Sequence, residues 1–312
     1  MATWAYPQIP PDKLRLEEEK ALTQELEWLL RSFQTTLTSL REGLEECATL
    51  LAPAETGSTL VLSSMRSESV KGFVTRVGTK IVKGDINLRL NSLPPPAGST
   101  STKLNLSSSP NSPTVILSQL VTVRDLIDQS LDVVDVSTYT GDPLNASFIY
   151  GQLRLLRENL SEARLALKGE GDETRGKWWE TSVDENAFDP PLPPHVSFHL
   201  SIADAALVLY LRTLEPNSPS ETPATVFAPE VSLSGFSIRE RFFGTKRPHH
   251  DETGDVFDWN GQEVTVREKV RVESQDPSLM AAMAKLNALE HEVAKCKSTL
   301  ATLMGEDDTE SD

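Results

Sequence analysis

The chain has little cysteine and no long run of apolar residues. Its 312 residues include two cysteines, Cys47 and Cys296, and both fall at apolar positions of expected helices, where cysteine packs as a small hydrophobe. No apolar segment approaches the roughly 20 residues that span a bilayer. Near the start, prolines and acidic residues replace the apolar core of a secretory signal. We therefore expect two free thiols in a cytoplasmic protein that does not insert into a membrane.

The sequence also lacks the motifs that carry chemistry. Gly169, Gly171 and Gly176 lie in a polar stretch rather than between a strand and a helix, so no phosphate-binding loop is predicted. His195 and His199 fall on one expected strand, about 13 Å apart along its axis, which is too far for a shared metal ion. No Gly-x-Ser-x-Gly elbow is present. We expect no catalytic, cofactor-binding or metal-binding residue, and therefore no enzyme.

Positive charge is in deficit, with 30 Lys and Arg against 46 Asp and Glu and a formal net charge of −16. Such a surface repels the phosphates of nucleic acids and anionic lipid headgroups. The stretch from 12 to 20, which precedes a leucine repeat, is acidic on balance, whereas a DNA-binding zipper needs a basic helix there. Nucleic acid is therefore excluded as an expected partner.

Leucine recurs every seven residues at Leu30, Leu37, Leu44 and Leu51. This spacing predicts a helix of about 57 Å from 14 to 51, with one apolar seam that needs a partner along its length. That partner is either the later helices of the same chain or a second copy in a homodimeric zipper. We expect the first, and hence a monomer when isolated, because three other stretches carry matching stripes. The assigned seam residues are Leu26, Leu30, Phe33, Leu37, Leu40, Leu44, Leu51, Leu279, Leu286, Val293 and Leu300.

Hydrophobic periodicity predicts an α+β protein. Helices are expected at 14–51, 114–136, 143–168 and 277–304, with a short apolar helix at 203–214. Strands are expected at 58–65, 70–77, 81–90 and 196–202, and in a late hairpin that turns at Asn260-Gly261. The element order predicts an elongated antiparallel four-helix bundle of residues 12–52, 114–168 and 277–304. A discontinuous antiparallel β domain would comprise 56–91 and 195–275.

Four segments are expected to be loops or disordered: 92–113, 169–194, 244–254 and 305–312. Trp178 and Trp179 stand out in the second of them, because two adjacent tryptophans are costly to expose. Either they dock onto their own domain or they anchor a partner, since tryptophan is enriched in binding hot spots. The candidate partner contacts are Trp178, Trp179, Phe242, Phe243, Lys246 and Arg247.

Several short motifs, in this order and spacing, resemble the Rogdi leucine-zipper family. Together they cover about two-thirds of the chain. The motifs are Leu16-Glu17-Glu18-Glu19, Glu27-Trp28-Leu29-Leu30, Val70-Lys71-Gly72, Gly84-Asp85-Ile86-Asn87-Leu88, the Val196–Ile202 strand, Leu214-Glu215-Pro216-Asn217-Ser218 and Phe257-Asp258-Trp259.

The resemblance implies a helical bundle with a β domain and no catalytic residues. It also implies a non-catalytic subunit of a fungal-type RAVE complex, which promotes assembly and reassembly of the vacuolar proton-pumping ATPase. The implied partners are the large WD-repeat subunit of that complex and peripheral-sector subunits of the pump, which can recruit the protein to vacuolar or endosomal membranes. The alternative function is a homo-oligomeric coiled-coil scaffold unrelated to the pump.

Overall fold

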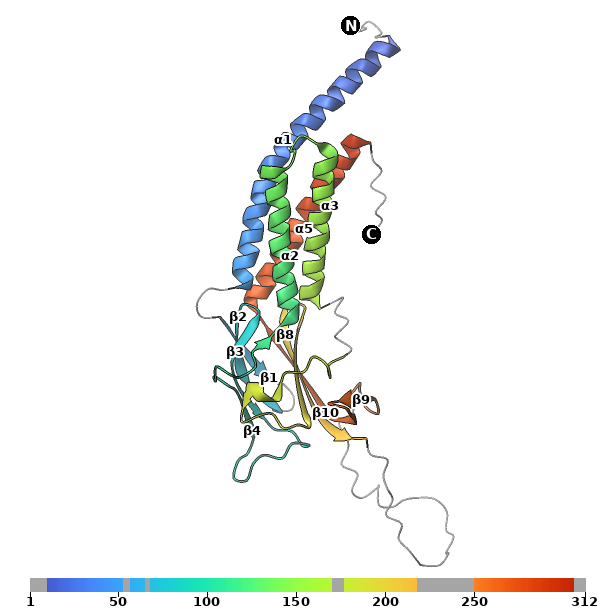
Figure 1. The fold of residues 1–312 in the computed structure, drawn as a ribbon. Helices are drawn as coiled ribbons and strands as arrows, with labels where there is room; N and C mark the ends of the chain where they lie inside the picture. Colours follow the sequence, from blue (N-terminus) through green and yellow to red (C-terminus); the bar gives the residue numbers. More distant parts are fainter. Residues whose placement is uncertain (1–9, 53–56, 65–67, 170–176, 218–249, 306–312) are drawn as a thin grey trace, which may run out of the picture. The chain divides into compact units, whose positions relative to one another are not determined.

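The computed structural model describes residues 10–52, 57–64, 68–169, 177–217 and 250–305 (Figure 1). The chain divides into two compact units, each built from segments far apart in sequence. A helical unit comprises 1–54, 118–170 and 277–312, and a β unit comprises 55–117 and 171–276.

Four α-helices are described in the helical unit, and local residues explain both ends of the third. The last helix has the predicted bounds, and Gly169 ends the third in the left-handed conformation at φ 80°, as expected of a C-terminal glycine. That helix starts at Ala146 rather than at 143, because the Asn145 side chain accepts a hydrogen bond from the backbone N–H of Phe148. The helices are α1 (Pro11–Leu51), α2 (Ser118–Asp135), α3 (Ala146–Lys168) and α5 (Pro277–Met304), and a π-helical turn, η1 (Val136–Thr140), follows α2.

The prediction of an elongated antiparallel four-helix bundle is wrong. Buried side chains of α1 begin only at Leu29, and the first half of this 41-residue helix extends past the other described helices of its unit (Figure 1). Four large apolar side chains of that half are exposed. The heptad repeat predicts which face of a helix is apolar, but it does not predict how far neighbouring helices extend along it. The exposed residues are Leu14, Leu16, Leu22 and Trp28.

Most of the assigned seam residues are buried within the helical unit, whereas Leu26 is half-buried. Cys47 and Cys296 are also buried, as predicted, and both are free thiols. Burial raises the pKa of Cys47 to about 12 and that of Cys296 to about 11, so little thiolate is present near neutral pH. The buried seam residues are Leu30, Phe33, Leu37, Leu40, Leu44, Leu51, Leu279, Leu286, Val293 and Leu300.

The described part of the β unit contains two antiparallel sheets. The first has the strand order β1-β2-β3-β4-β6, with β5 also paired to β3, and the second has the order β7-β8-β10-β9. The predicted hairpin turn is confirmed, because Asn260 and Gly261 have φ values of 53° and 78° between β9 and β10. The strands are β1 (Ser58–Ser63), β2 (Val70–Val77), β3 (Lys80–Leu88), β4 (Thr102–Leu106), β5 (Val115–Ile116), β6 (Phe188–Asp189), β7 (Val196–Ala203), β8 (Ala206–Pro216), β9 (Val256–Trp259) and β10 (Gln262–Gln275).

Three further predictions, one of a helix and two of loops, are wrong. The apolar stretch 203–214 is mostly strand β8, whose side chains are buried on both faces, so the alternation typical of a half-buried strand is missing. The expected loop 92–113 contains β4, and the expected loop 169–194 contains β6 and a 3-10 turn, η3 (Glu185–Ala187). Their polar composition predicts loops, but strands as short as β4 and β6 need only a few apolar side chains. Of 244–254 and 305–312, residues 244–249 and 306–312 lie outside the described residues.

A buried ion pair joins the two sheets. Arg76 of β2 donates from Nε to Oδ2 of Asp276, directly after β10, over 2.7 Å, and both side chains are fully buried. Ser58 of β1 donates to Oδ1 of the same carboxylate over 3.2 Å. The guanidinium also donates from Nη1 to the carbonyl of Gly78 over 2.7 Å. The two charges are therefore held where water does not reach, and each depends on the other for its solvation.

Leu37→Asp is expected to lower the free energy of unfolding of the helical unit by more than about 3 kcal/mol, because it places an unpaired charge in the seam. Thermal unfolding followed by circular dichroism at 222 nm measures the loss. The matched control is Ser39→Asp on the exposed side of the same helix, which should change the midpoint little. Equal midpoints for the two variants would contradict the assignment of Leu37 to the core.

Asp276→Asn is expected to destabilise the β unit by about 3–5 kcal/mol, because it leaves the buried Arg76 without its counter-charge. Urea unfolding followed by tryptophan fluorescence measures the difference. The exposed Arg267–Glu215 pair of the second sheet, at 2.6 Å, provides the comparison, and Glu215→Gln should cost at most about 1 kcal/mol. Similar losses in the two variants would show that the buried pair is not essential to the β unit.

Candidate functional site

The second sheet of the β unit has one apolar face and one polar face. Side chains alternate along each strand, so Phe198 of β7, Leu211 of β8 and Val270 of β10 form one row across the apolar face. On the other face, two neighbouring rows are polar or charged: Ser197, Arg212 and Lys269, and His199, Tyr210 and Arg271. The polar face is where the candidate site lies.

Two cations face each other on this polar face. Arg212 of β8 is directly opposite Lys269 of β10, and Tyr210 of β8 is directly opposite Arg271. Like charges in directly opposed positions destabilise a sheet. The Arg212 and Lys269 side chains are only 5% and 10% exposed, so water screens their repulsion poorly. The arrangement therefore requires negative charge nearby.

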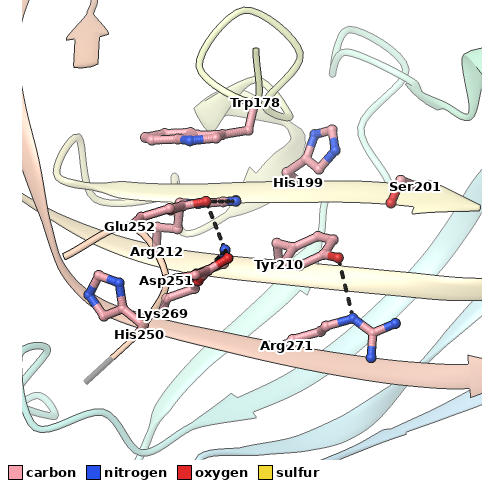
Figure 2. Close-up of a pocket in the computed structure, with 10 residues that line it drawn as sticks. All are labelled: Trp178, His199, Ser201, Tyr210, Arg212, His250, Asp251, Glu252, Lys269 and Arg271. Carbon is pink, nitrogen blue, oxygen red and sulfur yellow. Dashed lines mark hydrogen bonds and ion pairs between the residues drawn. The ribbon is translucent and has the colours of Figure 1, made fainter. Parts of the chain in front are cut away.

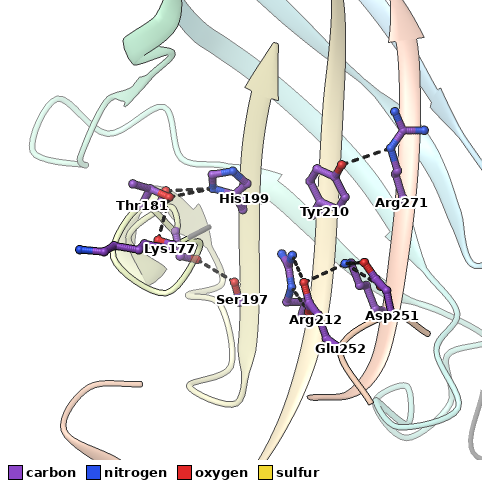
Figure 3. Close-up of polar contacts among 11 residues, drawn as sticks. Lys177, Thr181, Ser197, His199, Tyr210, Arg212, Asp251, Glu252 and Arg271 are labelled. Atoms are coloured by element: carbon purple, nitrogen blue, oxygen red, sulfur yellow. Dashed lines mark hydrogen bonds and ion pairs between the residues drawn. The ribbon is translucent and has the colours of Figure 1, made fainter. Parts of the chain in front are cut away.

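A turn before β9 supplies that negative charge. Glu252 accepts two hydrogen bonds from Arg212, from Nε over 2.8 Å and from Nη2 over 2.7 Å. Lys269 donates to Glu252 over 2.8 Å and to both carboxylate oxygens of Asp251 over 2.8 Å each (Figure 3). The two carboxylates thus neutralise the two opposed cations and fix the turn against the sheet.

The ion pairs also determine how these acids titrate. Burial alone would raise the pKa of Glu252, but hydrogen bonds from Arg212 and Lys269 lower it below its ordinary value. The hydrogen bond from Lys269 likewise lowers the pKa of Asp251. Both groups are therefore ionised near neutral pH and already engaged, which makes them poor general acids or bases.

Trp178 covers the Arg212 end of this polar face. Its ring lies 4.5 Å from the guanidinium carbon, a cation–π contact, and Tyr210 lies 5.2 Å away from the same carbon. Trp178 is 3% exposed and packs with Leu214, Val264 and Val266, so it is docked onto its own unit. Around it lie the partly buried side chains of Trp179, Phe257 and Trp259.

Between these groups lies a cavity of about 390 Å³ (Figure 2), a size typical of a site for a small ligand or a side chain. His199 contacts Thr181 through Nδ1 at 3.2 Å, and Tyr210 accepts from Nε of Arg271 over 3.3 Å. Among the described residues, no three His, Cys, Asp or Glu side chains come close enough together to hold a metal ion. The cavity is lined by Trp178, His199, Ser201, Tyr210, Arg212, His250, Asp251, Glu252, Lys269 and Arg271.

Of the predicted partner contacts, Trp178 lines the cavity but is too buried to offer much area to a protein surface, whereas Trp179 is half-buried at its side. Phe242, Phe243, Lys246 and Arg247 lie outside the described residues. His195 is exposed, while His199 is buried on the polar face.

Sequence reasoning missed the charged residues of the cavity. The signal was present in part, because Lys269 and Arg271 alternate with valines along a predicted strand. The incorrect prediction of a helix over 203–214 does not place Arg212 on the same sheet face as Lys269. The acids of the turn could not be assigned, because their position opposite the cations depends on tertiary structure.

Within the described helices, none is both long and apolar enough to cross a bilayer.

Glu252→Gln is expected to lower the free energy of unfolding by about 1.5–3 kcal/mol at pH 7, the range for hydrogen bonds to charged groups. Because the folded-state pKa lies below the unfolded value of about 4.3, this stabilisation is present above that pH and is lost as the pH falls through the folded-state pKa. Urea unfolding of both proteins at pH 7 and pH 3 measures the difference. The exposed Glu263→Gln is the control, and a pH-independent difference would argue against the ion pair.

A search of curated proteins finds no match to the chain. A family profile described as "Rogdi leucine zipper containing protein" matches residues 25–301. The matched region includes the buried part of α1, both sheets and nearly all of α5. Because this is most of its length, the chain belongs to the family of Rogdi leucine zipper containing proteins.

Proposed function

We propose that this chain is a non-catalytic subunit of a RAVE-type complex, which promotes assembly and reassembly of the vacuolar proton-pumping ATPase through protein–protein binding. The observation that carries the proposal is the family match over residues 25–301. Family membership suggests a non-enzymatic role in protein interaction, and the family is not known as an enzyme family. The direct partners would be the large WD-repeat subunit and peripheral-sector subunits of the pump.

The exposed half of α1 supports a binding role. Leu16 and Leu22 are 56% and 51% exposed, although both are large apolar side chains. Leu16 lies two heptads before Leu30, and Leu22 lies four residues before Leu26. Both therefore continue the apolar face of the seam toward the N-terminus. An amphipathic helix that leaves such a face uncovered is a common element of recognition between proteins. We therefore assign residues 14–28 as a partner-binding segment.

The chemistry of the polar cavity also favours binding over catalysis. Its two carboxylates are held in ion pairs that lower their pKa values. The two cysteines are buried with raised pKa values, so they are weak nucleophiles. The isolated protein would be a monomer in the cytoplasm, and its partners would recruit it to vacuolar or endosomal membranes.

The experiment that tests the function is affinity purification of the tagged full-length chain from lysates of glucose-fed and glucose-starved cells, followed by mass spectrometry. The expected result is recovery of a large WD-repeat protein together with peripheral-sector subunits of the pump. The double variant Leu16→Asp/Leu22→Asp should recover less of them without unfolding, because both side chains are exposed. Ala21→Asp/Gln24→Asp, on the side of the same exposed segment that faces away from the seam, is the matched control.

Recovery of neither the WD-repeat protein nor pump subunits under either condition would overturn the proposal. In that case the same exposed face favours the second candidate, a homo-oligomeric coiled-coil scaffold, because an uncovered apolar stripe on a helix can pair with a second copy. Light scattering separates the two functions. A monomer is expected for the complex subunit, and a dimer that Leu16→Asp/Leu22→Asp dissociates is expected for the scaffold.

A further inference from the structure

The polar cavity of the β unit contains donors whose hydrogen-bonding capacity is unused. Nη1 of Arg212 and Nε1 of Trp178 are buried, and within the described part of the chain neither has a hydrogen-bond partner. Arg212 is 5% exposed and Trp178 is 3% exposed, so bulk water does not satisfy them. A buried polar group without a partner is costly and therefore uncommon in native structures. Both residues line the same cavity.

The donors limit the chemistry of a ligand. Arginine and indole N–H groups only donate, so the bound group must present acceptor atoms. Negative charge would be favourable beside Arg212, but Asp251 and Glu252 already neutralise Arg212 and Lys269. Arg271, the third cation of the lining, also pairs with the exposed Glu273 over 2.8 Å. The cavity lining itself therefore has three cations, Arg212, Lys269 and Arg271, against two carboxylates. A group with acceptor oxygens and one negative charge fits this balance better than a dianion such as phosphate.

The site is held rigidly before any ligand binds. The Arg212 guanidinium is stacked on Trp178, and two of its nitrogens are fixed by Glu252. An arginine fork that already binds one carboxylate in this way has its remaining N–H groups set in a fixed plane. Such preorganisation lowers the entropy lost on binding.

An apolar surface adjoins these donors. The ring of Trp178 contacts Phe257 and Trp179, with centroid distances of 5.0 Å and 5.8 Å. Phe257 and Trp179 are only partly buried. A ligand whose acceptor group enters the cavity can therefore place an apolar side chain on these rings, which a free carboxylic acid of small size cannot do.

From this geometry we propose that the cavity binds the side-chain carboxylate of an acidic residue that is followed by an apolar residue in a segment of a partner protein. Arg212 Nη1 and Trp178 Nε1 donate to the carboxylate oxygens, and the apolar residue packs on Trp179 and Phe257. This inference rests on the proposed function, since it names the chemistry that the protein recognises in a partner.

The test uses the full-length protein labelled with ¹⁵N, in which the five tryptophans give separate indole N–H resonances. Trp178→Phe identifies the Trp178 signal by its loss. The probe is the acetylated and amidated tetrapeptide Gly-Glu-Leu-Gly, which has a single carboxylate. We expect a saturable downfield shift of the Trp178 indole proton, because it gains an acceptor. The Gly-Gln-Leu-Gly peptide should bind about tenfold more weakly, since hydrogen bonds to charged groups are stronger.

Two further titrations, at matched ionic strength, separate other ligands. Acetate that binds as tightly as the Glu peptide would assign the cavity to a free carboxylic acid and overturn the partner segment. Inorganic phosphate that binds more tightly than either would overturn the carboxylate. The absence of a selective, saturable shift of the Trp178 signal would show that water alone fills the cavity.

Variants test the roles of the two donors by calorimetry with the Glu peptide. Arg212→Lys keeps a positive charge but removes the fork, and Trp178→Phe keeps the ring but removes the N–H, so both should lose most of the binding. Arg267→Lys, at an exposed ion pair on β10, should bind as the wild type does. Unchanged binding in Trp178→Phe, whose fold the thermal midpoint checks, would overturn the site even if Arg212→Lys fails to fold. Failure of these titrations would leave capture of the pump complex unaffected, so the two proposals fail separately.

Discussion

The β unit depends on the ion pair between Arg76 and Asp276. These two side chains come from different sheets and are fully buried, at 2.7 Å from Nε to Oδ2. A buried pair of this kind adds little net stability compared with apolar residues, but breaking it is costly because one charge is left without solvation. We therefore expect the pair to favour the one arrangement of the two sheets in which both charges are satisfied. The strand β10, which ends beside Asp276, is held in the same position.

The location of β10 determines the cavity. One face of this strand packs in the core of the second sheet, and the other presents Lys269 and Arg271 to the polar face. Opposed cations on neighbouring strands would repel, and the turn with Asp251 and Glu252 resolves that repulsion. The same two acids leave one edge of Arg212 unused beside Trp178. The charge pattern of the sheet and the donors of the cavity thus have one physical origin.

Some of this architecture follows from the sequence alone and some does not. Local signals predict the end of α3 at Gly169, both ends of α5 and the Asn260-Gly261 turn, because each depends on neighbouring residues. The sequence of β8 wrongly predicts a helix, because the strand is buried on both faces and its apolar and polar residues do not alternate. The pairing of Arg212 with Glu252 joins residues 40 positions apart, and no local pattern encodes it. The heptad repeat predicts the apolar seam on α1, but how much of the seam is buried depends on where the neighbouring helices end.

The uncovered start of α1 has a consequence for how the protein associates. Residues 11–28 form about five helical turns whose local support is limited to contacts such as the exposed Lys20–Glu17 pair. Most of the stability of a helix in a protein comes from tertiary packing, which the exposed side chains of this segment lack within the described structure. These turns would therefore fray and re-form, while those after Leu29 are held by the core. Any protein that docks on this segment must offset the conformational entropy lost on fixing it, which favours rapid exchange of partners over permanent attachment.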